Sequence, residues 1–179
     1  MTEMTTKARM EKIYNHEEPD RTPIYDTVWN STLERWRKEG MPEDANYVDY
    51  FDLDKFRSIG VDCTPRYPVE VLEETEEYKI RTSKWGTTLK DWKHQGGVPD
   101  FLDYKVTNPE AWEDAKERMK PTRDRIDWEY LEENYEKWRE EGAWISAGFW
   151  FGFDVTHSWM VGTETLLTAR SEGTRLNSS

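Results

Sequence analysis

The sequence predicts an α/β fold with a parallel sheet. Three segments rich in β-branched and aromatic residues, at positions 22–29, 56–62 and 143–151, are separated by stretches of helical periodicity. The third segment, AWISAGFWF, is apolar on both faces, which is typical of a buried strand in a parallel sheet. Strands that alternate with helices indicate βα units, in which each helix returns the chain to the same end of the sheet.

Two helices are expected around the first strand. Thr5 or Thr6 can cap a helix that runs to about Asn15, because a threonine hydroxyl can accept a hydrogen bond from the first turn. Ser31 and Glu34 have the spacing of a capping box and predict the start of a second helix.

A polar hairpin is expected after the second strand. Residues 76–93 contain two strand-like runs, EYKIRTS and TTLKDWK, which flank a turn at Trp85 and Gly86. The segment is too polar for the centre of a sheet, so we expect it to be an excursion over a surface.

Helices are also expected before and after the third strand. Asn108 followed by Pro109 is a cap with proline at the first helical position. A further helix covers residues 156–169. Between the Asn108 helix and the third strand, another helix carries an apolar stripe at amphipathic spacing, which favours packing against a sheet and consists of Trp128, Leu131, Tyr135 and Trp138.

The composition indicates a folded, acidic protein. The chain has 179 residues, a net charge of −12 and ten tryptophans, whose large rings favour a packed core. The negative charge disfavours nucleic-acid binding, which requires Lys and Arg against phosphate. Cys63 is the one cysteine, so a disulfide framework or a multi-cysteine metal site is excluded. The sequence has neither the apolar core of a signal peptide nor a membrane-length apolar stretch, and we expect a cytoplasmic location.

Five phrases, in a fixed order, carry a resemblance to a known family: TTKARMEKIYNHEEPDRTPIY, YFDLD, VLEETEEYKIRTSKWGTTLKDWK, VPDFLDYKVTNPEAWEDAKERM and WMVGTETLL. Their order resembles the N-terminal part of the uroporphyrinogen decarboxylase superfamily, in its decarboxylase-like branch. The resemblance implies a partial (β/α)₈ TIM barrel of about three βα units, with the hairpin as an excursion after strand two. Residues 1–170 would then be the N-terminal portion of the barrel domain, and residues 171–179 a disordered tail.

Three strands are too few to close such a barrel, which needs about 250 residues. We therefore expect a truncated chain. An open strand edge leaves backbone groups unpaired and favours association into a homo-oligomer.

The stretch GFWFGFDVTHSW, residues 148–159, marks the expected site. It stands at a strand-to-helix junction, where βα barrels bind their substrates. Its glycines allow a ligand to approach the backbone, and aromatic residues such as Phe151 can wall a pocket for a planar substrate. Alternatively, the same aromatic residues simply pack the top of the barrel.

The resemblance implies roles for particular residues. Asp62 matches a carboxylate that contacts pyrrole nitrogens, although an aspartate at a strand end can equally cap a turn. Trp159 stands near the position of a tyrosine in the family, and His157 can supply acid–base chemistry. The family's arginine-bearing loop after strand one is here a segment that contains Trp29 and no arginine. Arg66 is a possible substitute for binding substrate carboxylates.

The implied activity is decarboxylation of a carboxylated tetrapyrrole or a related small molecule, as in porphyrin biosynthesis. This chemistry is a lyase reaction without cofactor or metal, and the missing arginines favour a substrate with fewer carboxylates than uroporphyrinogen. Two alternatives remain open. One is a corrinoid-dependent methyltransferase of the same superfamily, which acts on a methyl carrier and whose zinc ligands lie in the C-terminal half. The other is a non-catalytic barrel fragment, inactive by itself.

Overall fold

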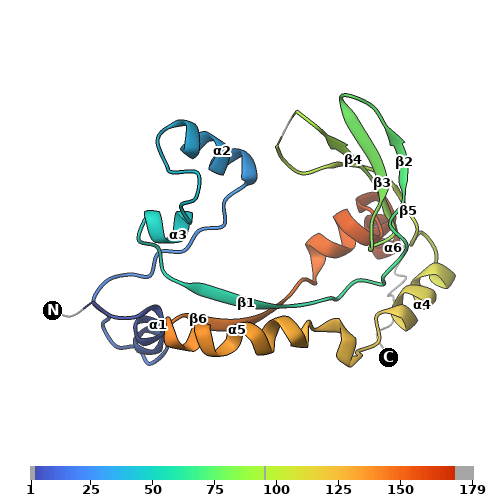
Figure 1. Cartoon of the computed structure of the whole chain (residues 1–179). Coiled ribbons are helices and arrows are strands. Elements are labelled where there is room, and N and C mark those ends of the chain that lie inside the picture. The colour runs from blue at the N-terminus through green and yellow to red at the C-terminus, as the bar shows by residue number, and fades with distance from the viewer. Residues whose placement is uncertain (1–2, 95, 172–179) are drawn as a thin grey trace. The chain divides into compact units, whose positions relative to one another are not determined.

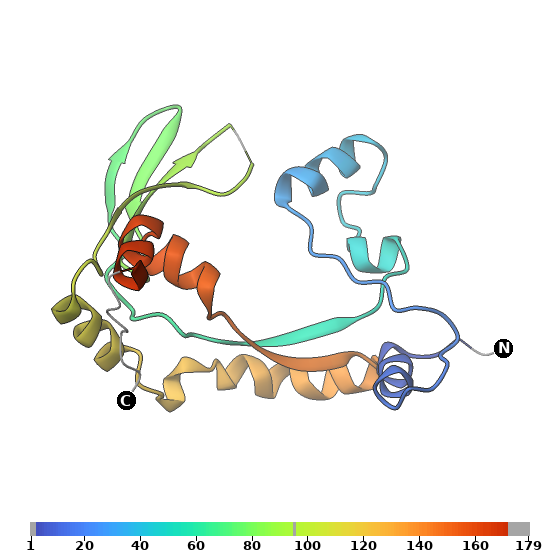
Figure 2. The same cartoon turned by 180° about the vertical axis from the view of Figure 1, so that it is seen from behind.

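A computed structural model describes residues 3–94 and 96–171. The chain forms two compact units, each made from two stretches of sequence (Figures 1 and 2). Unit 1 comprises Met1–Val61 and Ile126–Gly148, and unit 2 comprises Asp62–Arg125 and Phe149–Ser179. Within the described ranges, no helix has the length and apolar character needed to cross a membrane.

Unit 1 combines helices with a two-stranded parallel sheet. Thr5 caps the first helix as predicted, because its Oγ1 accepts the backbone N–H of Ala8 at 3.2 Å. The described elements of this unit are α1 (Thr6–Tyr14), α2 (Asn30–Lys38), α3 (Tyr47–Tyr50), β1 (Phe56–Val61), α5 (Trp128–Glu140) and β6 (Trp144–Phe149), of which the last residue already belongs to unit 2.

Helix α5 lies next to the parallel sheet. It runs alongside β1 and β6 in both views (Figures 1 and 2). Trp138 of the predicted apolar stripe is buried, whereas Tyr135 remains 37% exposed. The chain turns directly from α5 into β6, so this helix and strand form the helix–strand step that the sequence predicts.

The interior of unit 1 contains an ionic cluster. Arg9 on α1 is 1% exposed, and its guanidinium binds Asp20, with Nε 2.7 Å from Oδ1, and the fully buried Asp54. Asp54 also accepts hydrogen bonds from Thr6 Oγ1 at 3.0 Å and from Arg21 Nη1 at 2.7 Å. The hydrogen bond from Arg9 lowers the pKa of Asp20. Burial alone would raise the pKa of Asp54, but the hydrogen bonds that its carboxylate accepts outweigh burial and lower it.

Unit 2 is built around a four-stranded antiparallel sheet with the order β2–β3–β4–β5. The predicted hairpin is the central β3–β4 pair, and one further strand flanks it on each side. The described elements of unit 2 are β2 (Val71–Glu74), β3 (Tyr78–Thr82), β4 (Thr87–Trp92), β5 (Asp100–Tyr104), α4 (Pro109–Arg118), the 3₁₀-helix η1 (Arg123–Arg125), the π-helix η2 (Val155–Met160) and α6 (Thr163–Ser171).

One face of this sheet packs against η2. Leu89 and Thr87 on β4 are fully buried, and the Thr87 hydroxyl donates to the carbonyl oxygen of Trp159. The rings of Phe101 and Trp159 meet edge to face, with centroids 5.1 Å apart. The apolar core of unit 2 continues into the helices and consists of Tyr67, Trp85, Val106, Ala115, Val155, Met160, Val161 and Leu166.

The first predicted strand is absent from the structure. Residues 22–29 have no strand partner. The N–H of Ile24 donates to Asp54 Oδ2 at 2.8 Å, and the carbonyl oxygen of Ile24 accepts the N–H of Asp54 at 2.8 Å. Asp54 therefore provides hydrogen bonds to both backbone groups of Ile24. The predicted capping box is also wrong, because α2 begins at Asn30 and Ser31 lies inside the helix.

The third predicted strand is parallel to β1, but it is not a buried central strand. Ser146 and Ala147 of β6 are exposed, and Phe149 is 57% exposed. The predicted helix over residues 156–169 is divided at Gly162 into η2 and α6. Among the described strands there is a parallel pair and an antiparallel sheet, and no closed barrel. Of the predicted disordered tail, Ser171 ends α6, and residues 172–179 lie outside the described residues.

Candidate functional site

Asp62 directly follows β1 and forms a hydrogen-bonded turn. Its Oδ1 accepts the backbone N–H of Thr64 at 3.0 Å and the Thr64 hydroxyl at 2.7 Å. Its Oδ2 accepts from Arg66 Nε at 2.8 Å. Burial opposes ionisation, but the hydrogen bonds from Thr64 and Arg66 prevail and lower the pKa of Asp62 to about 2. The carboxylate therefore stays ionised at neutral pH.

Arg66 connects this turn to η1. Its Nη1 pairs with the carboxylate of Asp124, and its Nη2 donates to the Asp124 carbonyl oxygen at 2.9 Å. Together with the hydrogen bond from Nε to Asp62, all three nitrogen atoms of the guanidinium therefore have a partner. The two carboxylates balance the positive charge of the guanidinium, so an arginine held in this way stabilises a loop and attracts a substrate carboxylate less strongly than an unpaired arginine would.

The segment after β6 contains an uncommon helix type. Residues Val155–Met160 form a π-helix, which carries both His157 and Trp159. Glycines in the left-handed region bracket it, Gly152 at φ +101° and Gly162 at φ +89°. π-Helical turns are rare and occur frequently at functional sites.

Aromatic rings gather around this helix. Trp159 meets Trp150 at 5.1 Å between centroids, and Trp150 in turn meets Trp85 at 6.3 Å. Phe151 is 71% exposed and stacks on Phe149 at 5.0 Å.

His157 is half-buried within the π-helix. Phe153 lies edge to face against its ring, with centroids 4.6 Å apart. Nδ1 of His157 contacts the hydroxyl of Ser158. The imidazole therefore has an aromatic neighbour on one side and a hydroxyl partner on one nitrogen.

The structure places the predicted site residues in separate groups. Asp62 and Arg66 form one pair, and Trp159 lies among the aromatic rings beside His157. Within the described residues, no hydrogen bond, ion pair or ring contact joins Asp62 to His157 or Trp159. Trp29 belongs to unit 1, where it precedes α2 and is 60% exposed.

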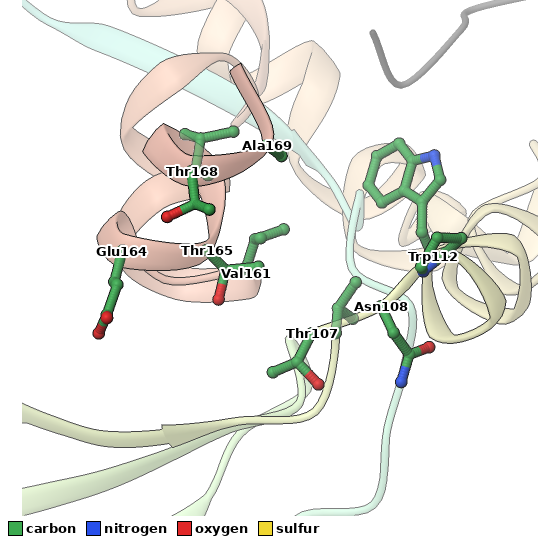
Figure 3. Close-up of a pocket in the computed structure, with 11 residues that line it drawn as sticks. Thr107, Asn108, Trp112, Val161, Glu164, Thr165, Thr168 and Ala169 are labelled. Carbon is green, nitrogen blue, oxygen red and sulfur yellow. The ribbon is translucent and has the colours of Figure 1, made fainter. Parts of the chain in front are cut away.

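A pocket between α4 and α6 in unit 2 was not predicted from the sequence. Its volume is about 450 Å³, and Figure 3 shows Trp112 on one side and α6 on the other. The Asn108 cap and the periodicity of the last helix were both visible in the sequence. Nothing in the sequence indicates that the two helices approach each other, because they are separated by more than forty residues. The lining is formed by Val106, Thr107, Asn108, Pro109, Trp112, Val161, Glu164, Thr165, Leu166, Thr168 and Ala169.

In the part of the chain that the structure describes, no group of three or more His, Cys, Asp or Glu side chains is arranged to hold a metal ion. No protein-family model, curated protein or solved structure matches this chain.

Proposed function

We propose that this chain belongs to an enzyme similar to uroporphyrinogen decarboxylase, which removes a carboxyl group from a small pyrrole-type acid without a cofactor. The observation that carries the proposal is the π-helix η2, which begins six positions after the end of the parallel strand β6 and carries His157 and Trp159 between two left-handed glycines. Parallel pairing of β1 with β6, and a helix that leads into β6, support a βα arrangement.

His157 is assigned the proton transfer. When the bond to the carboxyl carbon breaks, carbon dioxide leaves and the electron pair stays on the side-chain carbon next to the ring, which must then gain a proton. An imidazole suits this step because it can donate a proton to the substrate and then take up another proton from solvent. Trp159, two residues further along the π-helix, meets Trp150 edge to face, and these two rings supply aromatic surface for the substrate.

Asp62 is assigned the stabilisation of positive charge on the protonated pyrrole. A carboxylate can accept about four hydrogen bonds, and the three described at Asp62 leave room on Oδ2 for a substrate N–H. For Asp62 to act with His157, substrate binding must bring the two groups to one molecule. Arg66 is already paired with Asp62 and Asp124, which further favours a substrate with few carboxylates.

The test is a decarboxylation assay on the purified protein, with product separation by chromatography. Its substrates are uroporphyrinogen and porphobilinogen, a single pyrrole that carries one acetate and one propionate. We expect weak or no turnover of uroporphyrinogen and preference for the acid with fewer carboxylates. His157→Gln should lower turnover by about 10²–10⁴-fold, the range typical of losing a general acid. Trp159→Phe should be milder because the aromatic ring is retained.

Three results would contradict the proposal. Efficient conversion of uroporphyrinogen to coproporphyrinogen would refute the expected substrate preference. Absence of carbon dioxide release from both acids, or wild-type turnover in His157→Gln, would refute the assigned chemistry.

A further inference from the structure

Strand β2 forms an open edge of the antiparallel sheet in unit 2. It pairs with β3 on one side, and no other described strand pairs with it (Figure 1). All four residues of β2 are exposed. Three aliphatic side chains gather here, Val69, Val71 and Leu72, which are 53%, 53% and 56% exposed. Aliphatic side chains on an open edge favour pairing with another chain, because they add buried apolar area to the backbone hydrogen bonds that the edge offers.

The pairing with β3 shows which backbone groups of β2 face the open edge. In an antiparallel pair, successive residues direct their N–H and C=O groups alternately toward the partner strand and away from it. Glu70 and Thr75 each form a backbone hydrogen bond to β3 at 2.9 Å. Val71 and Glu74, which lie next to them inside β2, therefore direct their N–H and C=O groups to the open edge. These four groups can bind a further strand.

The charge at this edge is strongly negative. Two glutamates have partners within the sheet, because Glu73 accepts the hydroxyl of Tyr78 at 2.6 Å and Glu74 pairs with Lys93 at 2.8 Å. Three more glutamates in the same stretch of sequence are exposed and have no ion pair within the described residues, namely Glu70, Glu76 and Glu77. A strand that carries positive charge is attracted to this edge, whereas a strand that carries negative charge is repelled.

We propose that β2 receives an extended, lysine- or arginine-bearing segment of a partner protein as a fifth strand of the sheet. Backbone hydrogen bonds to the open edge would supply affinity, and alternate side chains would supply specificity. Basic side chains pair with the unpaired glutamates, and apolar side chains cover the exposed aliphatic residues. A second copy of this chain is disfavoured as the occupant, because its own β2 carries the same glutamates and each copy has a net charge of −12. The residues assigned to decarboxylation lie outside β2, so this proposal does not depend on that activity.

The first experiment compares three synthetic peptides of equal length by fluorescence anisotropy with the purified chain. The first peptide alternates lysine with valine, the second glutamate with valine, and the third lysine with proline. We expect the lysine–valine peptide to bind, with an affinity that falls at high salt because exposed charges are screened. The glutamate–valine peptide should show no binding. The lysine–proline peptide should bind at least about tenfold more weakly, because it keeps the charge but lacks half of the N–H donors.

Charge variants then assign the binding to this edge. Glu70 and Glu76 flank β2 at its two ends, and the double variant Glu70→Gln, Glu76→Gln should weaken binding of the lysine–valine peptide by roughly fivefold, as expected for two exposed ion pairs. The matched control is Glu129→Gln, Glu133→Gln, which makes the same change of net charge at exposed positions of α5 in unit 1. The control should bind the peptide as the wild type does.

Val71→Pro tests the contribution of the backbone. It removes an N–H that faces the open edge, and proline is tolerated at such positions of an edge strand. Binding of the lysine–valine peptide should fall by about tenfold, with circular dichroism to verify the fold. Hydrogen exchange on the wild-type chain gives a second measurement that does not need this variant. The bound peptide should raise the protection of residues 69–76 and leave that of α4 unchanged.

Several outcomes would overturn the proposal. They are no binding of the lysine–valine peptide, equal binding of the lysine–proline peptide, equal losses in the two double variants, or unchanged exchange in residues 69–76 when the peptide is bound. Protection of the same residues that rises with the concentration of the chain alone would identify a second copy as the occupant. All of these measurements record binding, so they remain informative if the protein decarboxylates no substrate.

Discussion

At the scale of single residues, Asp62 shows how one side chain can satisfy two interpretations. Its position at the end of β1 is where the family resemblance places a catalytic carboxylate. The structure shows the turn that the alternative interpretation predicts, with Thr64 and Arg66 as donors. The position after a strand could be predicted from local sequence. The pairing of Arg66 with Asp124 could not, because the two residues are 58 positions apart in the chain.

Asp62→Asn separates the two roles. The pair with Arg66 is partly exposed, and Asn can still accept the hydrogen bonds from Thr64, so the free energy of unfolding should fall by only about 0.2–1 kcal/mol. If the charge stabilises the transition state, turnover should fall by about 10²–10³-fold. Urea unfolding and the decarboxylation assay measure the two effects on the same preparation. Wild-type turnover in the folded variant would show that Asp62 is structural only.

Asp54 offers a second residue-scale prediction. Asp54→Ala leaves the buried guanidinium of Arg9 without one of its carboxylates, and should lower the free energy of unfolding by about 3 kcal/mol or more. Asp49→Ala is the control, because the Asp49 carboxylate is 63% exposed and pairs with Lys55, and its loss should cost less than about 1 kcal/mol. Equal losses of stability, measured by urea unfolding, would contradict a structural role for the buried cluster.

At the scale of elements, the local sequence was sufficient to predict a helix start, because a capping side chain accepts a backbone hydrogen bond from residues next to it in the chain. Helices α1 and α4 begin at the predicted caps, because Thr5 and Asn108 accept backbone N–H groups three residues ahead. A strand needs a partner, and residues 22–29 have β-type side chains without one. The same reason explains why β2 and β5 were missed. Their strand character comes from pairing with the predicted β3–β4 hairpin.

The break between η2 and α6 depends on Gly162. Its φ of +89° is unfavourable for other residues, and an added Cβ would lie 2.8 Å from the ring of Tyr104. Gly152, with φ +101° and nothing within 4 Å of an added Cβ, is the matched control. Gly162→Ala should therefore cost about 1–3 kcal/mol more than Gly152→Ala, the increment expected from overpacking. Equal thermal or urea stability of the two variants would show that the contact with Tyr104 does not hold the break.

At the scale of the whole molecule, the interiors of the two units differ in composition. Unit 2 has a continuous cluster of eight buried apolar residues. The buried apolar residues of unit 1 within the described chain are Met41, Trp138 and Ala143, and its interior also holds Arg9 and Asp54. The division itself could not be predicted from the sequence, because each unit joins segments that are far apart in the chain.

This difference predicts that acid unfolds unit 1 before unit 2. Asp20 and Asp54 have folded-state pKa values below their unfolded value of about 4, so the stability they contribute is present above pH 4 and is lost as the pH falls below it. Unit 2 also contains carboxylates with lowered pKa values, namely Asp62, Asp114 and Asp124. Their side chains are 24%, 48% and 65% exposed, whereas Asp54 is fully buried, so we expect their ion pairs to contribute less to stability. Hydrogen exchange measured by mass spectrometry at stepwise lower pH, corrected for intrinsic rates, should show peptides from α1 and β1 losing protection before peptides from β3 and β4.

Asp54→Asn provides the control for this order of unfolding, because asparagine has no charge to lose. The variant should already have weaker protection in α1 and β1 at pH 6, and that protection should change less between pH 6 and pH 3 than in the wild type. Its unit 2 peptides should behave as in the wild type. Simultaneous loss of protection in both units, or earlier loss in β3 and β4, would mean that the buried ion pairs of Arg9 do not determine the acid stability of unit 1.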